Sequence, residues 1–265
     1  MNFLRIGLVC FFIGGFDSFA FAQEWLEEKS KHFSVLYRNS ADLGSAQKTL
    51  REAESYYSKI GDLIGYTRYS DFWTWDQRVQ IYLYPDKKSF MEETGQPEWS
   101  TGVSASHQPG VTQRVIASFK QSQDFFEGLL PHEVSHLVLH DFVGDTRNLP
   151  LWFDEGIAQY QEAKKSEMAD RMMRSYIAQG QYVHIADLMI WNVREEKDQT
   201  KVNVFYGESV SLVNFLIKRY GSFAFSGFFR NIRDGVPFEM ALQKAYTNQL
   251  NSLQDMEDKW LKYLK

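Results

Sequence analysis

The chain has 265 residues, of which 44% are hydrophobic and 24% are charged, so it has enough apolar mass to fold around a core. This composition excludes a disordered or collagen-like protein. The formal net charge of −5 comes without a conspicuous basic run, so we expect no nucleic-acid partner. The single cysteine excludes a disulfide framework within the chain.

Residues 1–22 have the pattern of a secretory signal peptide. Residues 1–5 carry one positive charge, residues 6–16 are almost wholly apolar, and Ala20-Phe21-Ala22 gives the small-x-small pattern that signal peptidase reads. The apolar stretch is shorter than the roughly 20 residues that span a bilayer. We therefore expect cleavage near Ala22, an extracytoplasmic mature protein (periplasmic or secreted), and no stable membrane insertion after cleavage. The alternative is an uncleaved N-terminal anchor.

Strand and helix patterns then alternate up to about residue 120. Alternating β-branched and aromatic residues predict strands, and apolar residues at helical spacing predict helices. Glycine and proline mark the ends of these elements. We expect strands at residues 32–37, 79–84, 101–106 and 113–119, a long helix at 41–64 ending at Gly65, a short helix at 87–94 closed by Gly95, and a turn at Gln108-Pro109-Gly110.

From Phe125 onward the helical pattern continues almost to the end of the chain. Strands mixed with one helix, followed by a run of helices, favour an α+β fold over a wound parallel sheet. We expect a single domain over residues 23–265, with an α/β part at 23–120 and a helical part at 121–265. The sequence contains no signal that predicts an oligomeric state.

The segment His132-Glu133-Val134-Ser135-His136 contains the motif H-E-x-x-H. Residues four apart lie on one face of a helix, so both imidazoles can reach one metal ion, and neutral imidazole suits zinc. Glu133 lies about 100° around the helix, where it can take a proton from a water at the metal without ligating the metal. We expect this helix to begin near residues 128–131, because Pro131 is tolerated only in a first turn, and to end at Gly144.

A catalytic zinc ion takes three protein ligands and keeps one open position. Further along the chain, Trp152-Phe153-Asp154-Glu155-Gly156-Ile157-Ala158 places Glu155 19 positions after His136. Here the chain resembles the gluzincins, the thermolysin and aminopeptidase-N type of metallopeptidase. Their H-E-x-x-H is followed about 18–20 residues later by a glutamate, often in a W-x-x-E-G-x-A setting. The chain is most similar to small bacterial secreted proteins with a stand-alone peptidase-MA-like domain.

The resemblance implies His132, His136 and Glu155 as ligands of one Zn²⁺ per chain, Glu133 as general base, and a peptide or protein as substrate. It also implies a zincin-like fold, in which a small N-terminal mixed sheet places its edge strand over the active-site helix, and a mainly helical part follows. Asp154 is the competing carboxylate. Its equivalent in the family is usually not a ligand, and an acidic residue in the first turn complements the helix dipole.

A further helix is expected to begin near Tyr206. It resembles the helix of aminopeptidase-N-type enzymes whose opening tyrosine donates a hydrogen bond to the oxyanion, so Tyr206 is the expected donor. The alternative for Tyr206 is a plain packing role. His184 is the second candidate donor, since thermolysin-like enzymes use a histidine downstream. His140 lies a turn beyond His136, and we expect it to be a helix-end histidine rather than a ligand.

The sequence departs from the family at two places. Aminopeptidases carry a Gly-x-Met-Glu-Asn strand whose glutamate holds the free amine of the substrate, whereas the best candidate strand here, residues 102–106, contains no glutamate. Aminopeptidase activity is therefore disfavoured, although this strand can still pair with a substrate backbone. Thermolysin-like enzymes also place an aspartate four residues after the ligand glutamate, where this chain has Gln159, whose amide orients an imidazole less strongly.

Three functions are consistent with these residues. The favoured one is a secreted zinc metallopeptidase. The second keeps the zinc ion but changes the substrate, as in an amidase that acts on cell-wall peptide. The third is an envelope scaffold with a vestigial site, and the intact Glu133 argues against it, because structural zinc has no need of a base. The residues do not distinguish endopeptidase from exopeptidase activity.

Overall fold

The computed structural model describes residues 25–66, 78–98, 100–105, 114–120, 122, 124–144 and 149–265. The expected signal peptide and the expected turn at residues 108–110 lie outside the described residues. By their internal contacts the described residues form two compact units, one that lies within residues 25–56 and 78–133 and one that lies within residues 57–66 and 134–265. Two of the unit boundaries fall inside helices, namely α1 (Leu43–Ile64) and α3 (Leu130–Val143). The expected single domain with a division at residue 120 stays a prediction.

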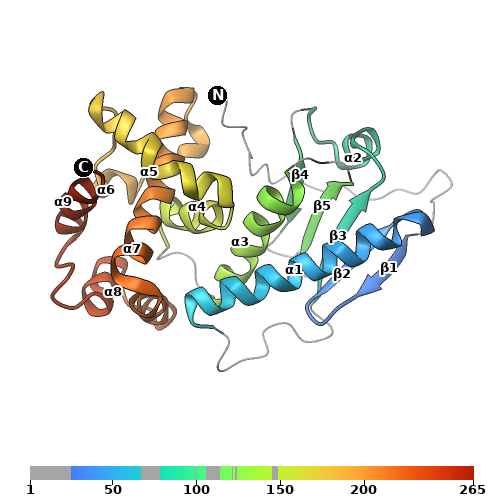
Figure 1. The fold of residues 1–265 in the computed structure, drawn as a ribbon, viewed down its shortest axis with the longest axis horizontal. Coiled ribbons are helices and arrows are strands. Elements are labelled where there is room, and N and C mark those ends of the chain that lie inside the picture. Colours follow the sequence, from blue (N-terminus) through green and yellow to red (C-terminus); the bar gives the residue numbers. More distant parts are fainter. Residues whose placement is uncertain are drawn as a thin grey trace. The chain divides into compact units, whose positions relative to one another are not determined.

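The first unit is built on a five-stranded mixed sheet with the order β1-β2-β3-β5-β4 (Figure 1). The three inner strands are parallel to one another, and the two edge strands run antiparallel to their neighbours. The expected strands are confirmed to within two residues, and β1 was not expected, because its sequence LEEK lacks apolar alternation. The strands are β1 (Leu26–Lys29), β2 (Phe33–Tyr37), β3 (Val79–Tyr84), β4 (Gly102–Ala105) and β5 (Val115–Phe119).

Both faces of this sheet carry buried side chains. Side chains alternate along a strand, so every second residue of neighbouring strands lies on the same face, and the first face is the one that carries Phe33 and Ile81. On the other face, Tyr84, Ala117 and Phe119 pack with Phe90 of helix α2 (Lys87–Thr94). Helix α2 ends at Gly95 in the left-handed conformation, as expected. The first face is completely or almost completely buried at Phe33, Val35, Val79, Ile81, Leu83 and Ile116.

Two short turns also belong to the first unit. The turn η1 (Ser40–Asp42) leads into α1, and Asn39 caps it by accepting from the N–H of Ala41 at 2.9 Å. The π-helical turn η3 (Phe125–Leu129) leads into α3. The expected long helix at residues 41–64 is therefore confirmed, with its regular part beginning at Leu43.

The second unit is helical, and α7 is its central helix, in contact with α4, α5, α8 and α9. The expectation that a helix begins near Tyr206 is wrong. Helix α7 begins at Gln199, because the carboxylate of Asp198 caps it by accepting from the N–H of Thr200 at 2.8 Å. The elements are α4 (Leu151–Tyr160), α5 (Ala163–Ala178), α6 (Ile185–Leu188), η5 (Val193–Glu195), α7 (Gln199–Arg233), α8 (Phe238–Ala245) and α9 (Leu253–Tyr263).

Aromatic side chains fill the contact of α4 with α7 and α8. Phe153 stacks on Phe229 at 5.6 Å between ring centroids and meets other rings edge-on. Gly156 allows the backbones of α4 and α7 to approach, since a Cβ there would lie 2.6 Å from the carbonyl oxygen of Ser209. A larger residue at this position would push α4 away from α7. The fully buried rings of this cluster are those of Trp152, Phe153, Phe225, Phe228 and Phe229.

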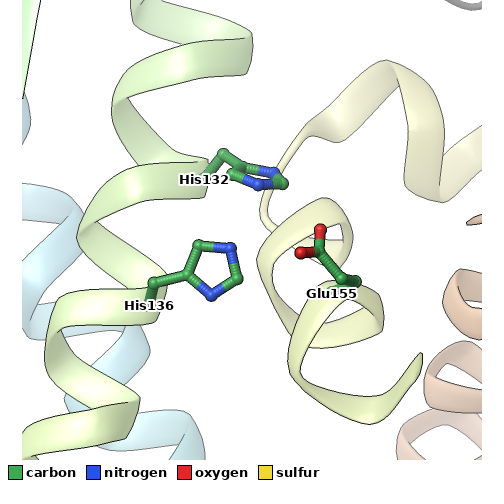
Figure 2. A group of neighbouring side chains, drawn as sticks. All are labelled: His132, His136 and Glu155. Carbon is green, nitrogen blue, oxygen red and sulfur yellow. The ribbon is translucent and has the colours of Figure 1, made fainter. Parts of the chain in front are cut away.

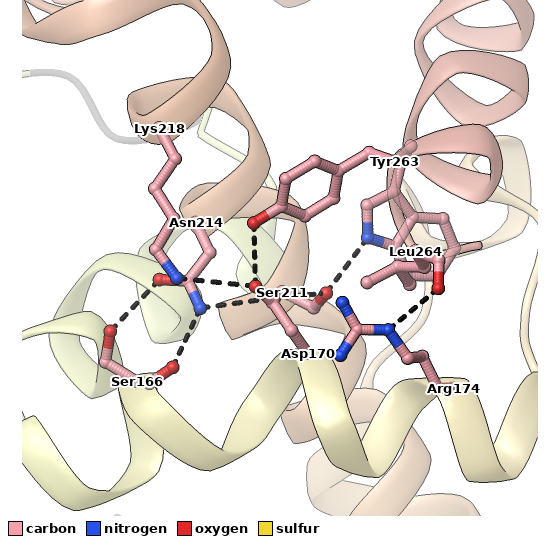
Figure 3. Close-up of polar contacts among 9 residues, drawn as sticks. Ser166, Asp170, Arg174, Ser211, Asn214, Lys218, Tyr263 and Leu264 are labelled. Atoms are coloured by element: carbon pink, nitrogen blue, oxygen red, sulfur yellow. Dashed lines mark hydrogen bonds and ion pairs between the residues drawn. The ribbon is translucent and has the colours of Figure 1, made fainter.

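A buried polar cluster fixes the C-terminal helix of this unit (Figure 3). The carboxylate of Asp170 on α5 accepts hydrogen bonds from Ser211 of α7 at 2.9 Å and from the hydroxyl of Tyr263 of α9 at 2.8 Å. Trp260 of α9 donates to the hydroxyl of Ser211 at 3.0 Å. We call these residues, with Asn214 and Lys218 of α7, the Asp170 cluster.

The architecture confirms the expected α+β class, with a mixed sheet toward the N-terminus and a mainly helical remainder. Within the described ranges, no helix combines the length and the apolar character needed to cross a membrane.

Candidate metal centre

Helix α3 presents the two histidines of the H-E-x-x-H motif on one face. His132 and His136 are one turn apart, and both are buried, at 3% and 5% exposure. The helix begins where expected, because Pro131, which has no N–H to donate, lies at the change from the π-helical turn to the α-helix. It also ends as expected, with Gly144 in the left-handed conformation and its N–H bonded to the carbonyl of His140 at 2.9 Å.

Helix α4 supplies the third member of the group. Glu155 is 4% exposed, and Figure 2 shows its carboxylate on α4 and the imidazoles of His132 and His136 on α3 pointing toward one another. One ligand atom from each of these residues lies within 4.8 Å of the other two. The structure therefore brings together the three residues that the sequence predicts as ligands, and this group can hold a metal ion.

Asp154 precedes Glu155 on helix α4, and its carboxylate contacts the imidazoles of two histidines. Its Oδ1 is 2.8 Å from Nδ1 of His136, and its Oδ2 is 2.8 Å from Nε2 of His140. Burial opposes the ionisation of Asp154, yet the charges and hydrogen bonds of the two imidazoles hold the pKa of this carboxyl well below its usual range. A carboxylate on Nδ1 leaves Nε2 of His136 to coordinate, which is how ligating histidines are commonly oriented.

Sequence reasoning missed this bridge. It placed the orienting group at Gln159 and considered Asp154 as a competing ligand or as a charge that complements the helix dipole, whereas Asp154 contacts both histidines directly. His140 was expected at the helix end, where it lies, and its contact with Asp154 was not foreseen. The available signal was the spacing of His136 and His140, which lie one turn apart on the same face of a helix, so that one carboxylate can contact both.

Glu133 lies on the same helix and points to the sheet. Its side chain is 2% exposed, and its Oε2 accepts a hydrogen bond from the hydroxyl of Ser104 on β4. Strand β4 is an edge strand of the sheet, as the sequence predicts for residues 102–106. The bond to Ser104 was not predicted, because a lone serine in a strand carries no signal of its partner.

Tyr206 lies about two turns into α7, which is a different position from the expected helix start. Burial raises its pKa above the ordinary value, the charge of Glu155 adds to this rise, and Arg194 opposes it. The phenol therefore stays protonated and able to donate a hydrogen bond. Arg194, on the turn η5, also lies 3.9 Å from Oε1 of Glu155 and is half exposed. The sequence analysis did not predict Arg194 near this group.

His184 occupies a different setting. Its Nδ1 lies 2.8 Å from the carboxylate of Glu257 on α9, and its ring meets Tyr182 edge-on at 5.4 Å. The hydrogen bond that the carboxylate of Glu257 accepts from His184 raises the pKa of this histidine. The same carboxylate accepts from the N–H of Ile185 at 2.8 Å, so it caps the start of α6. The choice between Tyr206 and His184 as donor stays a prediction.

A family model described as the Peptidase MA superfamily matches residues 73–265, a range that includes the H-E-x-x-H helix, Glu155 and Tyr206. The chain belongs to the Peptidase MA superfamily. Among curated proteins, none matches the chain.

Proposed function

We propose that this chain is a zinc-dependent metallopeptidase of the gluzincin type that hydrolyses peptide bonds in peptides or proteins outside the cytoplasm. The observation that carries the proposal is the buried group of His132, His136 and Glu155, with ligand atoms within 4.8 Å of one another. Two imidazoles and one carboxylate are the donors of a catalytic zinc site, and three donors leave a position for the reaction. The donor set therefore fits Zn²⁺.

Each remaining residue has a role in this proposal. Bound zinc would supply a Lewis acid that activates water and polarises the peptide carbonyl. Glu133 takes a proton from the attacking water and later gives it to the leaving amine. The hydroxyl of Tyr206 donates a hydrogen bond to the carbonyl oxygen as negative charge develops there. Asp154 holds the tautomer and orientation of His136 through the 2.8 Å contact.

The edge strand β4 supports a peptide as substrate. In the described sheet it pairs with β5 on one side, and a strand of this kind can bind an extended peptide by backbone hydrogen bonds on its other side. Its residue Ser104 contacts Glu133, so a peptide paired with β4 would lie beside the proposed base.

The direct test is metal analysis of the mature protein together with digestion of a peptide library, with and without a chelator. We expect about one zinc ion per chain, hydrolysis that the chelator abolishes, and a sharp loss of zinc in the Glu155→Ala variant. Zinc that is retained in Glu155→Ala but lost in Asp154→Ala would show that the third ligand is wrong. A zinc-loaded protein that cleaves no peptide would favour the amidase or scaffold function.

The extracytoplasmic location rests on the signal pattern of residues 1–22. Expression of the full chain in bacteria, followed by fractionation and N-terminal sequencing, tests it. We expect a periplasmic or secreted protein that begins near Gln23, and an uncleaved protein in the membrane fraction would favour the anchor instead.

A further inference from the structure

Two residues of the edge strand β4 face the start of helix α3. Gly102 and Ser104 are two positions apart, so they lie on the same face of the sheet. A Cβ on Gly102 would lie 2.0 Å from the Leu129 side chain, which shows that this face packs directly against the π-helical turn before α3. The hydroxyl of Ser104 therefore projects toward α3, where it donates to Oε2 of Glu133.

This contact is isolated from solvent. Ser104 is 8% exposed and Glu133 is 2% exposed. A hydrogen bond to a carboxylate is worth more than one to a neutral acceptor, and a buried carboxylate that loses such a bond is left poorly solvated. The Ser104 hydroxyl uses one oxygen of a group that offers two oxygens and about four lone-pair sites. The bond at Oε2 thus fixes the rotation of the carboxylate without using Oε1.

We propose that Ser104 is a positioning residue for Glu133: its hydroxyl holds Oε2 so that Oε1 is presented to the attacking water. The proposal rests on the proposed function in so far as Glu133 is the base. Backbone groups of a strand lie in the plane of the sheet, while side chains project from it. Strand β4 therefore orients the base with the side chain of Ser104 and keeps its outer backbone groups for a peptide.

The test compares Ser104→Ala with two other variants in the zinc-loaded protein. Loss of a hydrogen bond that aligns a base affects the chemical step, so we expect Ser104→Ala to lower kcat about tenfold, with KM and zinc content unchanged. Ser104→Thr keeps a hydroxyl and should recover much of the loss. Ser118→Ala is the matched control, because Ser118 is a buried serine of the same sheet whose hydroxyl donates to the carbonyl of Thr101 at 2.6 Å.

A second measurement does not depend on activity. In the zinc-free protein, the melting temperatures of Ser104→Ala, Glu133→Ala and the double variant form a cycle. If the two side chains are bonded, the loss in the double variant is smaller than the sum of the two single losses. Additive losses overturn the bond and the proposal with it.

The possible outcomes distinguish a failure of the positioning role of Ser104 from a failure of the proposed peptidase function. Wild-type kcat in Ser104→Ala overturns the positioning role, and so does an equal loss of kcat in Ser104→Ala and Ser118→Ala, which would indicate a general disturbance of the sheet. A wild-type protein that hydrolyses no peptide overturns the proposed function instead. In that case the melting-temperature cycle alone decides whether Ser104 holds Glu133.

Discussion

Two buried aspartates of the helical unit, Asp154 and Asp170, are similar in exposure and different in their partners. Both are about 8–9% exposed, and each binds side chains from other helices. Asp170 accepts from hydroxyl, amide and ammonium groups, each of which already holds the proton it donates. Asp154 contacts two imidazoles, and an imidazole has a second nitrogen that can ligate a metal.

The difference shows that burial of a carboxylate does not by itself indicate a functional site. The Asp170 cluster satisfies its charge with donors from α7 and α9, and so it fixes helices to one another (Figure 3). The contact of Asp154 with His136 orients that ring, which belongs to the group that can hold a metal. We therefore expect changes around Asp154 to alter metal binding or turnover, and changes in the Asp170 cluster to alter stability.

The largest effect is expected for Glu133→Gln. The amide keeps the shape of the side chain but cannot take a proton from water, so hydrolysis should fall by about 10²–10⁴-fold. Zinc content and melting temperature should stay close to those of the wild type. Turnover and bound zinc are measured on the same preparation. Asp170→Asn serves as the control, with a lower melting temperature and near-normal turnover per folded molecule, and normal hydrolysis by Glu133→Gln would exclude the proposed mechanism.

The next largest effect is expected for Tyr206→Phe. The hydroxyl acts only when charge develops on the carbonyl oxygen, so kcat should fall by about 10²–10³, while KM and zinc content change little. The phenyl ring is retained, so a packing role for Tyr206 predicts near-normal kcat. His184→Ala is the comparison variant, and its inactivity beside a normal Tyr206→Phe would assign the donor role to His184.

A smaller effect is expected for Asp154→Asn. Loss of the carboxylate on Nδ1 of His136 should weaken zinc binding by about 10–100-fold, measured by competition with a chelator. Glu155→Ala should weaken zinc binding further, because it removes a ligand. Asp170→Asn should leave the affinity unchanged. Equal affinities for Asp154→Asn and the wild type would mean that the Asp154 bridge is structural, like the Asp170 cluster.

Local patterns in the sequence predicted most of the elements of the first unit. The strand at Val79–Tyr84 and the helix at Lys87–Thr94 have the predicted bounds, because alternation, the cap by Asp86 and the glycine at position 95 are all local signals. Strand β1 was missed because an exposed edge strand needs no apolar residues. The start of α7 was misplaced, although Asp198 followed by Thr200 is a capping pattern that the sequence contains.

At the candidate metal centre, the sequence predicted the residues that belong to a local motif, and it did not predict the residues that other elements bring into contact with them. His132, Glu133 and His136 follow from the motif, the resemblance to gluzincins implies Glu155, and the structure brings the three ligand candidates together. Ser104, Asp154 and Arg194 contact this group from a strand, a helix N-terminus and a short turn. Such contacts depend on tertiary packing, so one sequence cannot predict them.

The smallest effect is expected in the Asp170 cluster, for Tyr263→Phe. Burial and the hydrogen bond to Asp170 raise the pKa of Tyr263 to about 12. Removal of the hydroxyl should lower the free energy of unfolding by about 1 kcal/mol near neutral pH and leave turnover unchanged.

Because the folded-state pKa of Tyr263 lies above its unfolded value, the stability that this hydroxyl contributes is fully present below about pH 10 and is lost as the pH rises toward 12. Urea unfolding of both proteins at pH 8 and at several values above pH 10 measures the difference, which should shrink as the pH rises. A difference that stays constant, or a loss of turnover in Tyr263→Phe, would contradict a purely structural role for the Asp170 cluster.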